Sequence, residues 1–576
     1  MAEALRGRLP NEPFFVNLLK IANEIKHVII HDPQNRIDAD YSQLLTDVLR
    51  MQLLLKQSLP ESMFDDALNL LQVSNPYILI LSGKYEFIIA ALSIMSIGGA
   101  FAPLASSLLP EEAFYMLQTS RAICILADQQ HLQLAEECQG YAASQGISIP
   151  VLPISISNPP SEDLSNSDPC FEIDRKLTVE PHRPALILFT SGTSGPPKGV
   201  VHTRRLFYDI HTSSSPSEVF LSHDAIHWGS SLVTFVSSVL GGARTEIIPQ
   251  NAEAIWERLR EGGATTLGCA PRIWTQMMRH FEDHLSLLPT EKRNPYVRGA
   301  QSLSHALTRG SMPEPSVLQF WRDLGKRLHV CYGITELGAT VMKTTSDTDV
   351  NLERCIGRPM PGITVKLSSG SHGEMLIKKS VVFSHYLNDH GETAASFDSD
   401  GFYKTGDLAR RVGSDYILEG RASTDFIRCQ GLRVPILEVE MRLLQLPFIS
   451  EGCILQASDA HNGQIVAALV RLRTPEKTYL GDSGKVQRLE KPYLEVLRNS
   501  LGGALPTFML PTALRILQDE EEIPRTPSLK VIRGKAAEQY FPRSKSCELL
   551  TNVEVLDLGN NRDSRARKVW DWGGLL

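Results

Sequence analysis

The sequence predicts an α/β protein with a large N-terminal domain, made of two α/β sheet subdomains and a small β-rich subdomain, and a small α+β C-terminal domain. The chain has 576 residues, of which 42% are hydrophobic and 21% charged. This is the composition of a globular protein, and the length suffices for several domains. Residues 20–130 and 226–345 alternate helical patterns with short apolar strands, as in sheets covered by helices. From about residue 356, short strands separated by Gly turns replace this pattern.

One long segment of the first part, Phe87–Pro110, contains no charged residue. A transmembrane helix needs about 20 apolar residues, but Gly98 and Pro103 interrupt this segment. We therefore expect a buried helix at Phe87–Ile97, a glycine turn and a buried strand at Ala100–Leu104, rather than a membrane span.

The later elements are expected in the following order. Residues 155–183, rich in Ser, Asn, Pro and Asp, are expected to form a surface linker before a buried strand at Leu186–Phe189. Strands and helices of the rest of the N-terminal domain are expected at Thr245–Ile248, Ala252–Glu261, Ala264–Cys269, Leu328–Cys331, Thr364–Leu367, Gly373–Ile377 and Asp415–Leu418. Those of the C-terminal domain are expected at Ile436–Gln445, Gly452–Ser458, Ile465–Arg471 and Leu489–Leu501. The expected domains are 1–419 and 420–545, followed by a polar tail at 546–576.

Charge and cysteine usage exclude several classes of protein. Lys and Arg number 58 and Asp and Glu 65, for a formal net charge of −7, so nothing favours a nucleic-acid partner. The nine cysteines form no C-x-x-C pair, which argues against a disulfide framework or a zinc site. The first residues have no apolar signal-peptide core and the chain ends in Gly-Gly-Leu-Leu, so we expect a cytoplasmic protein.

A loop rich in glycine and hydroxyl residues follows the expected strand Leu186–Phe189. It reads Thr190-Ser-Gly-Thr-Ser-Gly-Pro-Pro-Lys-Gly199. The backbone N–H groups of such a loop can turn toward one point, and hydroxyl groups with a lysine can bind the oxygens of a polyphosphate. The Walker ending Gly-Lys-Ser/Thr is missing. The sequence therefore predicts a phosphate-binding loop of another kind, formed by Thr190, Ser191, Gly192, Thr193, Ser194, Gly195 and Lys198.

Four further motifs are weak signals when taken singly. In Tyr332-Gly-Ile-Thr-Glu336, the aromatic ring could stack on a purine and the carboxylate could bind Mg²⁺. In Tyr403-Lys-Thr-Gly-Asp407, the carboxylate could bind a ribose diol, although Asp is also common in β-turns. Arg421 could contact sugar or phosphate, or form a surface salt bridge. Lys530 lies in an expected loop, where a lysine is usually solvated.

In this order and spacing, the motifs resemble those of the adenylate-forming superfamily of acyl-CoA synthetases, luciferases and peptide-synthetase adenylation domains. The resemblance runs from about residue 78 to residue 533. It includes the segments Ala90–Leu117, Ile356–Gly362 and Ser384–Thr393. The segment Gly420–Glu440 is most similar to the branch that contains malonyl-CoA synthetases and medium-chain acyl-CoA synthetases.

The resemblance implies how ATP would be bound. Thr190–Lys198 would hold the β- and γ-phosphates. Tyr332 would lie on the adenine, with Gly310 and Ser311 passing beside it. The ribose hydroxyls would be bound by Asp407 and Arg421.

The resemblance also implies a reaction in two steps. ATP and a small-molecule carboxylic acid would form an acyl-adenylate and pyrophosphate, and the thiol of coenzyme A would then displace AMP. Thr335 would contact the α-phosphate and Glu336 the Mg²⁺, while Lys530 would reach the reacting carboxylate from a mobile C-terminal domain. For the second step this domain would rotate about a hinge near Ser423, and Gly431 would line the path of the thiol.

Two positions depart from the family pattern. Leu529 stands where Gly usually precedes the late lysine. Cys331 stands where malonate-specific members have an arginine, so a second substrate carboxylate has no obvious partner and a monocarboxylic acid is preferred. The candidate pocket residues are His227, Met312 and Ala339, although His227 could equally be a satisfied core histidine.

Three alternatives stay open. The enzyme could load the phosphopantetheine of a separate carrier protein instead of CoA. It could be a dicarboxylate ligase similar to malonyl-CoA synthetase. It could also be a nucleotide-binding homologue with impaired catalysis, a reading for which Leu529 is the only support.

Overall fold

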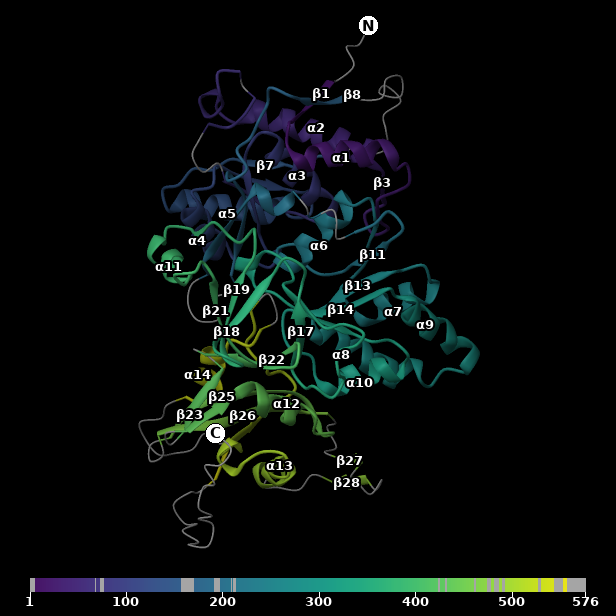
Figure 1. Ribbon diagram of the computed structural model, residues 1–576, viewed down its shortest axis with the longest axis vertical. Helices are drawn as coiled ribbons and strands as arrows, with labels where there is room; N and C mark the ends of the chain where they lie inside the picture. The colour runs from purple at the N-terminus through teal and green to yellow at the C-terminus, as the bar shows by residue number, and fades with distance from the viewer. Residues whose placement is uncertain are drawn as a thin grey trace. The chain divides into compact units, whose positions relative to one another are not determined.

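The computed structural model describes residues 6–556 apart from 68, 73–76, 157–169, 191–196, 209, 211–213, 423–424, 430–431, 460–462, 474–477, 481–485, 489–492, 527–529 and 543–552. The chain divides into two compact units, Met1–Leu418 and Glu419–Leu576. The first unit holds two large sheets covered by helices, and the second is a smaller α+β unit (Figure 1). The predicted fold class is confirmed.

The first sheet has seven strands in the order β20-β10-β9-β5-β4-β6-β7. They are β4 (Tyr77–Leu81), β5 (Ala100–Pro103), β6 (Cys124–Ala127), β7 (Val151–Pro153), β9 (Pro184–Phe189), β10 (Gly199–Thr203) and β20 (His385–Tyr386). The strands from β9 to β7 are parallel, and β10 is antiparallel to both of its neighbours. The strands β4, β5 and β10 are buried throughout, as expected of a sheet between helices. The helices of this region are α2 (Tyr41–Ser58), α3 (Lys84–Ser96), α4 (Pro110–Ser120) and α5 (Leu132–Ser144).

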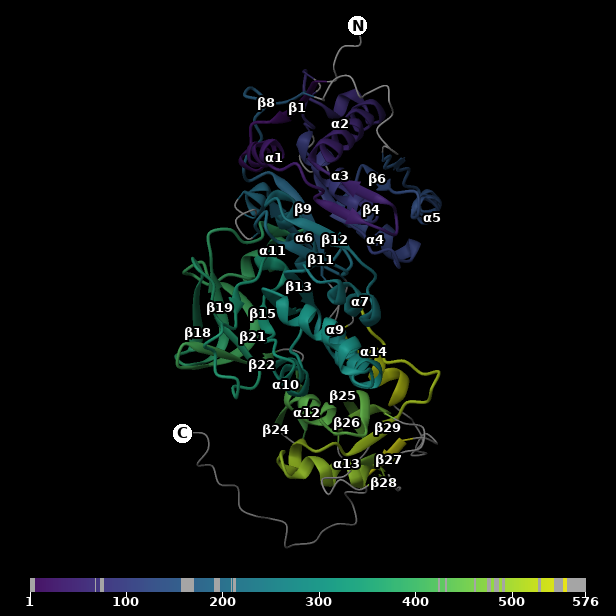
Figure 2. The same ribbon diagram turned by 90° about the vertical axis from the view of Figure 1, so that its right-hand side faces the viewer.

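The uncharged segment of the sequence forms helix α3, a glycine turn and strand β5. The helix is buried from Phe87 onward, and it packs beside α2 (Figures 1 and 2). Gly98 follows with a φ of +75°, a backbone conformation that favours glycine. The expected buried helix, turn and strand are therefore confirmed. In the described part of the chain, no helix combines the length and the apolarity that a membrane crossing needs.

The second sheet has thirteen strands in the order β18-β19-β21-β22-β17-β16-β15-β14-β13-β11-β12-β2-β3. They are β2 (Ile30–Asp32), β3 (Ile37–Ala39), β11 (Val219–Ser222), β12 (Arg244–Ile247), β13 (Thr266–Cys269), β14 (His305–Arg309), β15 (His329–Tyr332), β16 (Met342–Lys343), β17 (Cys355–Pro359), β18 (Thr364–Ser369), β19 (His372–Lys378), β21 (Tyr403–Val412) and β22 (Asp415–Arg421). The strands from β2 to β15 are parallel, and those from β15 to β18 are antiparallel. The strands expected to form the β-rich subdomain thus continue the hydrogen bonding of the second α/β sheet.

The helices beside the second sheet are α6 (Gly229–Leu240), α7 (Ala252–Glu261), α8 (Pro271–His280), α9 (Thr290–Ser302) and α10 (Pro315–Asp323). Three buried indoles form the centre of their core: Trp256 stacks on Trp321 at 5.4 Å, and Trp274 meets Trp321 edge-on at 4.7 Å. Helices α7 and α9 lie side by side (Figures 1 and 2). A Cβ at Gly299 would lie 1.8 Å from the carbonyl oxygen of Leu259, so glycine permits this approach.

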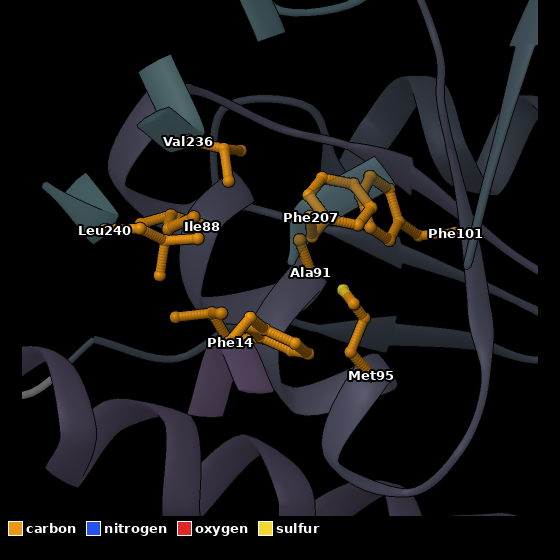
Figure 3. Close-up of a pocket in the computed structure, with 9 residues that line it drawn as sticks. Phe14, Ile88, Ala91, Met95, Phe101, Phe207, Val236 and Leu240 are labelled. Carbon is orange, nitrogen blue, oxygen red and sulfur yellow. The ribbon is translucent and has the colours of Figure 1, made fainter. Parts of the chain in front are cut away.

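A small apolar cavity lies in the core of the first unit, between α1 (Pro13–Glu24), α3 and α6. Figure 3 shows the side chains of Phe14, Phe207 and Met95 around it. All nine lining residues are apolar. Because no polar group faces this cavity, it offers a nucleotide no hydrogen bonds, and we regard it as a packing feature.

The second unit is built on a four-stranded sheet in the order β25-β26-β29-β30. Its elements are β23 (Phe426–Cys429), β24 (Leu432–Pro435), α12 (Ile436–Leu444), β25 (Ile449–Asp459), β26 (Gly463–Leu472), β27 (Thr478–Leu480), β28 (Val486–Arg488), α13 (Tyr493–Gly502), β29 (Ala513–Ile516), α14 (Arg533–Tyr540) and β30 (Val553–Val555). The strand β30 pairs with β29 although it lies in the expected polar tail. The reason is that Val553 and Val555 pack against the apolar core of this sheet.

Candidate active site

The two ends of the predicted phosphate loop, in the first unit, are joined by hydrogen bonds. The loop leaves β9 and returns at β10, and these strands are antiparallel neighbours. The N–H of Thr190 donates to the carbonyl oxygen of Lys198 at 2.9 Å, and the N–H of Lys198 donates to Oγ1 of Thr190 at 2.9 Å. The predicted residues Ser191, Gly192, Thr193, Ser194 and Gly195 lie outside the described residues.

The loop lysine is directed toward another segment of the same unit. Nζ of Lys198 lies 2.6 Å from Oε1 of Glu392 on α11 (His390–Ala395), and both side chains are partly exposed. Nζ also lies 5.2 Å from the ring centroid of Tyr386, on β20. The carboxylate and the aromatic face both attract the ammonium group of Lys198, which stays partly exposed to solvent.

The carboxylate of Glu336 belongs to the same group of side chains. Oε1 accepts a 2.8 Å hydrogen bond from the hydroxyl of Tyr386, and the backbone carbonyl of Glu336 accepts one from the N–H of Phe383. Glu336 lies in a turn, Thr335–Leu337, that follows β15. A half-buried carboxylate oxygen near a phosphate loop is a donor type that Mg²⁺ accepts, so Glu336 fits the predicted role.

The motif that begins at Tyr332 and the motif that ends at Asp407 are joined by a hydrogen bond. The hydroxyl of Tyr332, the last residue of β15, donates a 2.5 Å hydrogen bond to Oδ2 of Asp407 on β21. Both residues are buried. The sequence left open that Asp407 lies in a β-turn, whereas β21 starts at Tyr403 and includes the whole motif.

The turn that carries Thr335 is positioned by a buried histidine. Nε2 of His202, on β10, lies 2.9 Å from the carbonyl oxygen of Thr335. Burial lowers the pKa of His202 to about 4, so at neutral pH the ring is uncharged and Nε2–H donates to this carbonyl. Gly338 directly follows the turn Thr335–Leu337 and has a φ of +69°. A Cβ at this position would lie 3.0 Å from the His202 ring.

The residues predicted to pass beside the adenine and those predicted to line the acid pocket lie at the ends of neighbouring elements. Gly310 and Ser311 form the exposed turn after β14, and Gly310 has a φ of +91°. Met312 follows them, and Ala339 follows the Thr335 turn; both are half-buried. His227 precedes α6, burial lowers its pKa to about 4, and its Nε2 is buried with no hydrogen-bond partner among the described residues. The role of His227 as a pocket residue stays a prediction.

The remaining predicted residues belong to the second unit. Arg421 ends β22 and is exposed. Lys530 is also exposed; its carbonyl oxygen accepts a 2.8 Å hydrogen bond from the N–H of Thr526, and its own N–H donates to Oγ1 of Thr526 at 3.2 Å. Ser423, Gly431 and Leu529 lie outside the described residues. The roles of these five residues stay predictions.

Sequence reasoning missed three residues that the structure brings to this site. Tyr386 and Glu392 lie in the segment Ser384–Thr393, which carried the family resemblance, but no chemistry was assigned to them. His202 is three residues beyond the phosphate loop, in a strand that the sequence analysis did not separate from it. The sequence signal that could have identified His202 is a single histidine within a largely apolar strand.

Comparisons with known proteins identify the family of this chain. Residues 70–387 match the family model described as "AMP-binding enzyme". The chain belongs to this family. It is 36% identical over 564 residues to the acyl-CoA ligase oryP of Aspergillus oryzae, covering 96% of each chain. It is 26% identical to the mitochondrial malonate–CoA ligase ACSF3 of Bos taurus, covering 81% of this chain and 82% of that protein.

Solved structures of AMP-binding enzymes show the same fold. ATP-bound MatB from Rhodopseudomonas palustris superposes with a TM-score of 0.72 at 18% identity, covering 92% of this chain and 98% of that one. The o-succinylbenzoate CoA synthetase MenE of Bacillus subtilis, in complex with the acyl-adenylate OSB-AMP, gives 0.71 at 19% identity, covering 92% and 99%. The predicted membership of the adenylate-forming superfamily is confirmed, and so is the predicted enzyme class, an acid–thiol ligase.

Proposed function

We propose that this AMP-binding enzyme is an ATP-dependent acid–CoA ligase that forms an acyl-adenylate and then a thioester. One observation carries the proposal: five residues from three separate segments of the first unit are connected through short contacts, a shared partner or the chain itself. They are Thr190 and Lys198 of the loop, Tyr332 and Glu336 of the motif that begins at the end of β15, and Asp407 of β21. A phosphate loop, an acidic turn and a buried aromatic–carboxylate pair are the parts that ATP binding requires.

The residues of the first unit would orient ATP. Lys198 and the loop would bind the outer phosphates, and Glu336 would hold a magnesium ion, which supplies positive charge beside the phosphates. Asp407, kept in place by Tyr332, would accept hydrogen bonds from the ribose hydroxyls. The turn at Thr335, held by His202, would face the α-phosphate. Such fixed groups lower the barrier mainly by electrostatic stabilisation.

The carboxylate of the acid would attack the α-phosphorus, forming the acyl-adenylate and expelling pyrophosphate. Lys530 would neutralise charge on the reacting oxygens in this step only. The thiolate of CoA would then attack the acyl carbon and expel AMP, with Gly431 beside its path. The acyl-CoA ligase relative matches nearly the full length of this chain, which favours CoA over a carrier protein as the acceptor.

Pyrophosphate exchange into ATP, measured with a panel of carboxylic acids, tests the first step. Product analysis with CoA, and with a phosphopantetheinylated carrier protein, tests the second. Acid-dependent exchange and an acyl-CoA product are expected. The absence of exchange with every acid would support the catalytically impaired homologue, and a product with the carrier protein but not with CoA would support the carrier-loading alternative.

A single variant tests the proposed role of the second unit. Lys530→Ala should abolish pyrophosphate exchange and leave thioester formation from supplied acyl-adenylate largely intact. Lys535→Ala is the matched control, because Lys535 is an exposed lysine of the nearby helix α14. If Lys530→Ala reduced both half-reactions equally, the two-step assignment of this lysine would be wrong.

A further inference from the structure

A half-buried arginine lies next to the predicted nucleotide residues. Arg309 is the last residue of β14 and directly precedes Gly310 and Ser311. Its strand partner is Cys331, which directly precedes Tyr332. Paired residues on neighbouring strands place their side chains on the same face of the sheet. Arg309 is thus at the carboxyl edge of the parallel strands, where ligands of α/β proteins bind.

The guanidinium of Arg309 is held by one end only. Nη1 donates to the carbonyl oxygen of Ser230 at 3.1 Å and to Oγ1 of Thr234 at 2.5 Å, both on α6. The group rests against Gly268 of β13, where a Cβ would lie 2.0 Å from Nη2 and 3.0 Å from Nε. Glycine at 268 is therefore what makes room for this arginine.

Within the described ranges, Arg309 forms no ion pair, and its Nε is buried without a hydrogen-bond partner. The carboxylate to consider as a counter-charge is Asp224, because Asp224 and Arg309 both act electrostatically on His223 and Cys269. Asp224 instead accepts a hydrogen bond from Gln250 and lies 3.1 Å from Nδ1 of His223. A cation that is partly removed from water without a counter-charge is costly to keep in a fold. Such a residue indicates an anionic partner that binds from outside the chain.

Two further unpartnered nitrogen atoms lie at the start of the helix that Arg309 contacts. His227 and Trp228 directly precede α6. Nε2 of His227 and Nε1 of Trp228 are buried and have no hydrogen-bond partner among the described residues. The indole nitrogen can only donate. Buried polar atoms without partners are rare in native proteins, so this end of α6 lacks hydrogen-bond acceptors that a ligand would supply.

We propose that Arg309 binds a second carboxylate of the acid substrate, so that this enzyme activates a dicarboxylic acid. The inference rests on the proposed function and narrows its substrate class. The preference for a monocarboxylic acid depended on Cys331 leaving the pocket without a cation, and Arg309 provides that cation from the neighbouring strand. The free donors of its guanidinium bind a carboxylate more strongly than a neutral group, and Nε1 of Trp228 is one more donor at the start of α6, the helix that Arg309 contacts.

Matched acids test the inference. Adipate, suberate and sebacate are compared with hexanoate, octanoate and decanoate, and with the corresponding ω-hydroxy acids, in pyrophosphate exchange. The wild type should show a kcat/KM at least about tenfold higher for the dicarboxylate of each set, as expected for one charge-assisted interaction. Arg309→Met, which keeps the packing volume against Gly268, should lose this preference while the KM for ATP stays unchanged.

The matched control is Arg298→Met, which removes an exposed arginine of α9 in the same unit and should keep the preference. A wild type that prefers the monocarboxylic or ω-hydroxy acids would overturn the inference. An Arg309→Met enzyme that loses activity equally with every acid would do so too.

Melting temperatures separate this inference from the proposed function. Dicarboxylates should raise the melting temperature of the wild type and not that of Arg309→Met. If this shift occurs but no acid supports exchange, the Arg309 site stands and the proposed ligase activity fails. If exchange occurs but dicarboxylates give no Arg309-dependent shift or preference, the ligase activity stands and the Arg309 site fails.

Discussion

The hydroxyl of Tyr332 donates a hydrogen bond of 2.5 Å to Oδ2 of Asp407. The two residues are 75 positions apart in the sequence and lie on different strands of the second sheet. The contact fixes one carboxylate oxygen of a buried aspartate, and it sets the position of the aromatic ring at the same time. If Tyr332 contacts adenine and Asp407 contacts ribose, this hydrogen bond aligns the two halves of the nucleoside site.

Tyr332→Phe removes this hydrogen bond and keeps the ring. We expect the KM for ATP to rise about tenfold, because a hydrogen bond to a charged group contributes about 1.5–3 kcal/mol and 1.4 kcal/mol is a factor of ten. Steady-state kinetics with ATP as the varied substrate measure this. Tyr416→Phe is the control, since among the described residues the hydroxyl of Tyr416 makes only a long contact, 3.5 Å, with the carbonyl of Val365. An unchanged KM for Tyr332→Phe would contradict the nucleoside assignment.

The ion pair between Lys198 and Glu392 predicts opposite effects for its two members. Lys198→Met should raise the KM for ATP, because a phosphate ligand is lost. Glu392→Gln should lower it by a few-fold, because the carboxylate competes with phosphate for the same ammonium group. The effect is small because partly exposed pairs contribute about 0–1 kcal/mol. Lys378→Met serves as the control: its ammonium group is exposed, donates to the carbonyl of Asp400 and lies 5.5 Å from the ring centroid of Phe402.

The two variants are best compared by ATP titration in the pyrophosphate exchange assay. A rise in KM for Glu392→Gln would show that Glu392 orients Lys198 toward ATP instead of competing with it. Equal effects of Lys198→Met and Lys378→Met would remove Lys198 from the phosphate site.

Local sequence was sufficient to predict the elements that carry their own signal. The uncharged run of α3 and β5, and the buried strand β9 before the glycine-rich loop, needed no information from distant residues. The partners of the site residues could not be predicted in this way. Tyr386 contacts Glu336, and Glu392 contacts Lys198, only because β20 joins the edge of the first sheet beside β10. A pairing of strands almost 200 positions apart leaves no local pattern.

Arg309 illustrates the same limit for substrate recognition. Sequence comparison with malonate-specific members directs attention to Cys331, the position where they carry an arginine. The structure places a cation on the adjacent strand, paired with Cys331. The proposal that Arg309 replaces the missing arginine therefore depends on strand register, which pairs position 309 with position 331. The glycine at 268 that accommodates Arg309 is likewise informative only in three dimensions.

The buried ring of His202 predicts a pH dependence of stability. Its pKa is about 4 in the folded protein and about 6.5 in the unfolded chain. Between these values the unfolded chain binds a proton that the folded protein does not, so stability falls as the pH drops from 6.5 to 4 and is retained above 6.5. The pKa difference between the folded and unfolded states corresponds to a loss of unfolding free energy on the order of 3 kcal/mol.

His202→Gln keeps a donor for the carbonyl of Thr335 but cannot be protonated. Its melting temperature should therefore fall less than that of the wild type between pH 6.5 and pH 4, as measured by calorimetry. His372→Gln, which changes an exposed histidine of β19, should leave the profile of the wild type unchanged. Identical profiles for wild type and His202→Gln would mean that this ring is not kept neutral by burial.

The ion pair of Glu12 and Arg204 predicts a large effect on stability. Both side chains are fully buried, and Nε and Nη2 of Arg204 each lie 2.6 Å from a carboxylate oxygen of Glu12. The pair joins the start of α1 to the turn after β10, the strand that follows the phosphate loop. Glu12→Gln leaves a buried cation without its counter-charge, so we expect a loss of about 3–5 kcal/mol of unfolding free energy. Urea unfolding of the first unit, followed by intrinsic tryptophan fluorescence, measures it.

The double variant Glu12→Leu/Arg204→Met separates charge from packing at this position. Replacing a buried pair by apolar residues of similar volume is often neutral or stabilising, so the double variant should recover most of the stability that Glu12→Gln loses. Glu172→Gln is the single-site control, because its contact with Arg8 is exposed and 3.5 Å long. If the double variant were as unstable as Glu12→Gln, the cost would lie in lost packing between α1 and the turn, and the uncompensated charge of Arg204 would not be its cause.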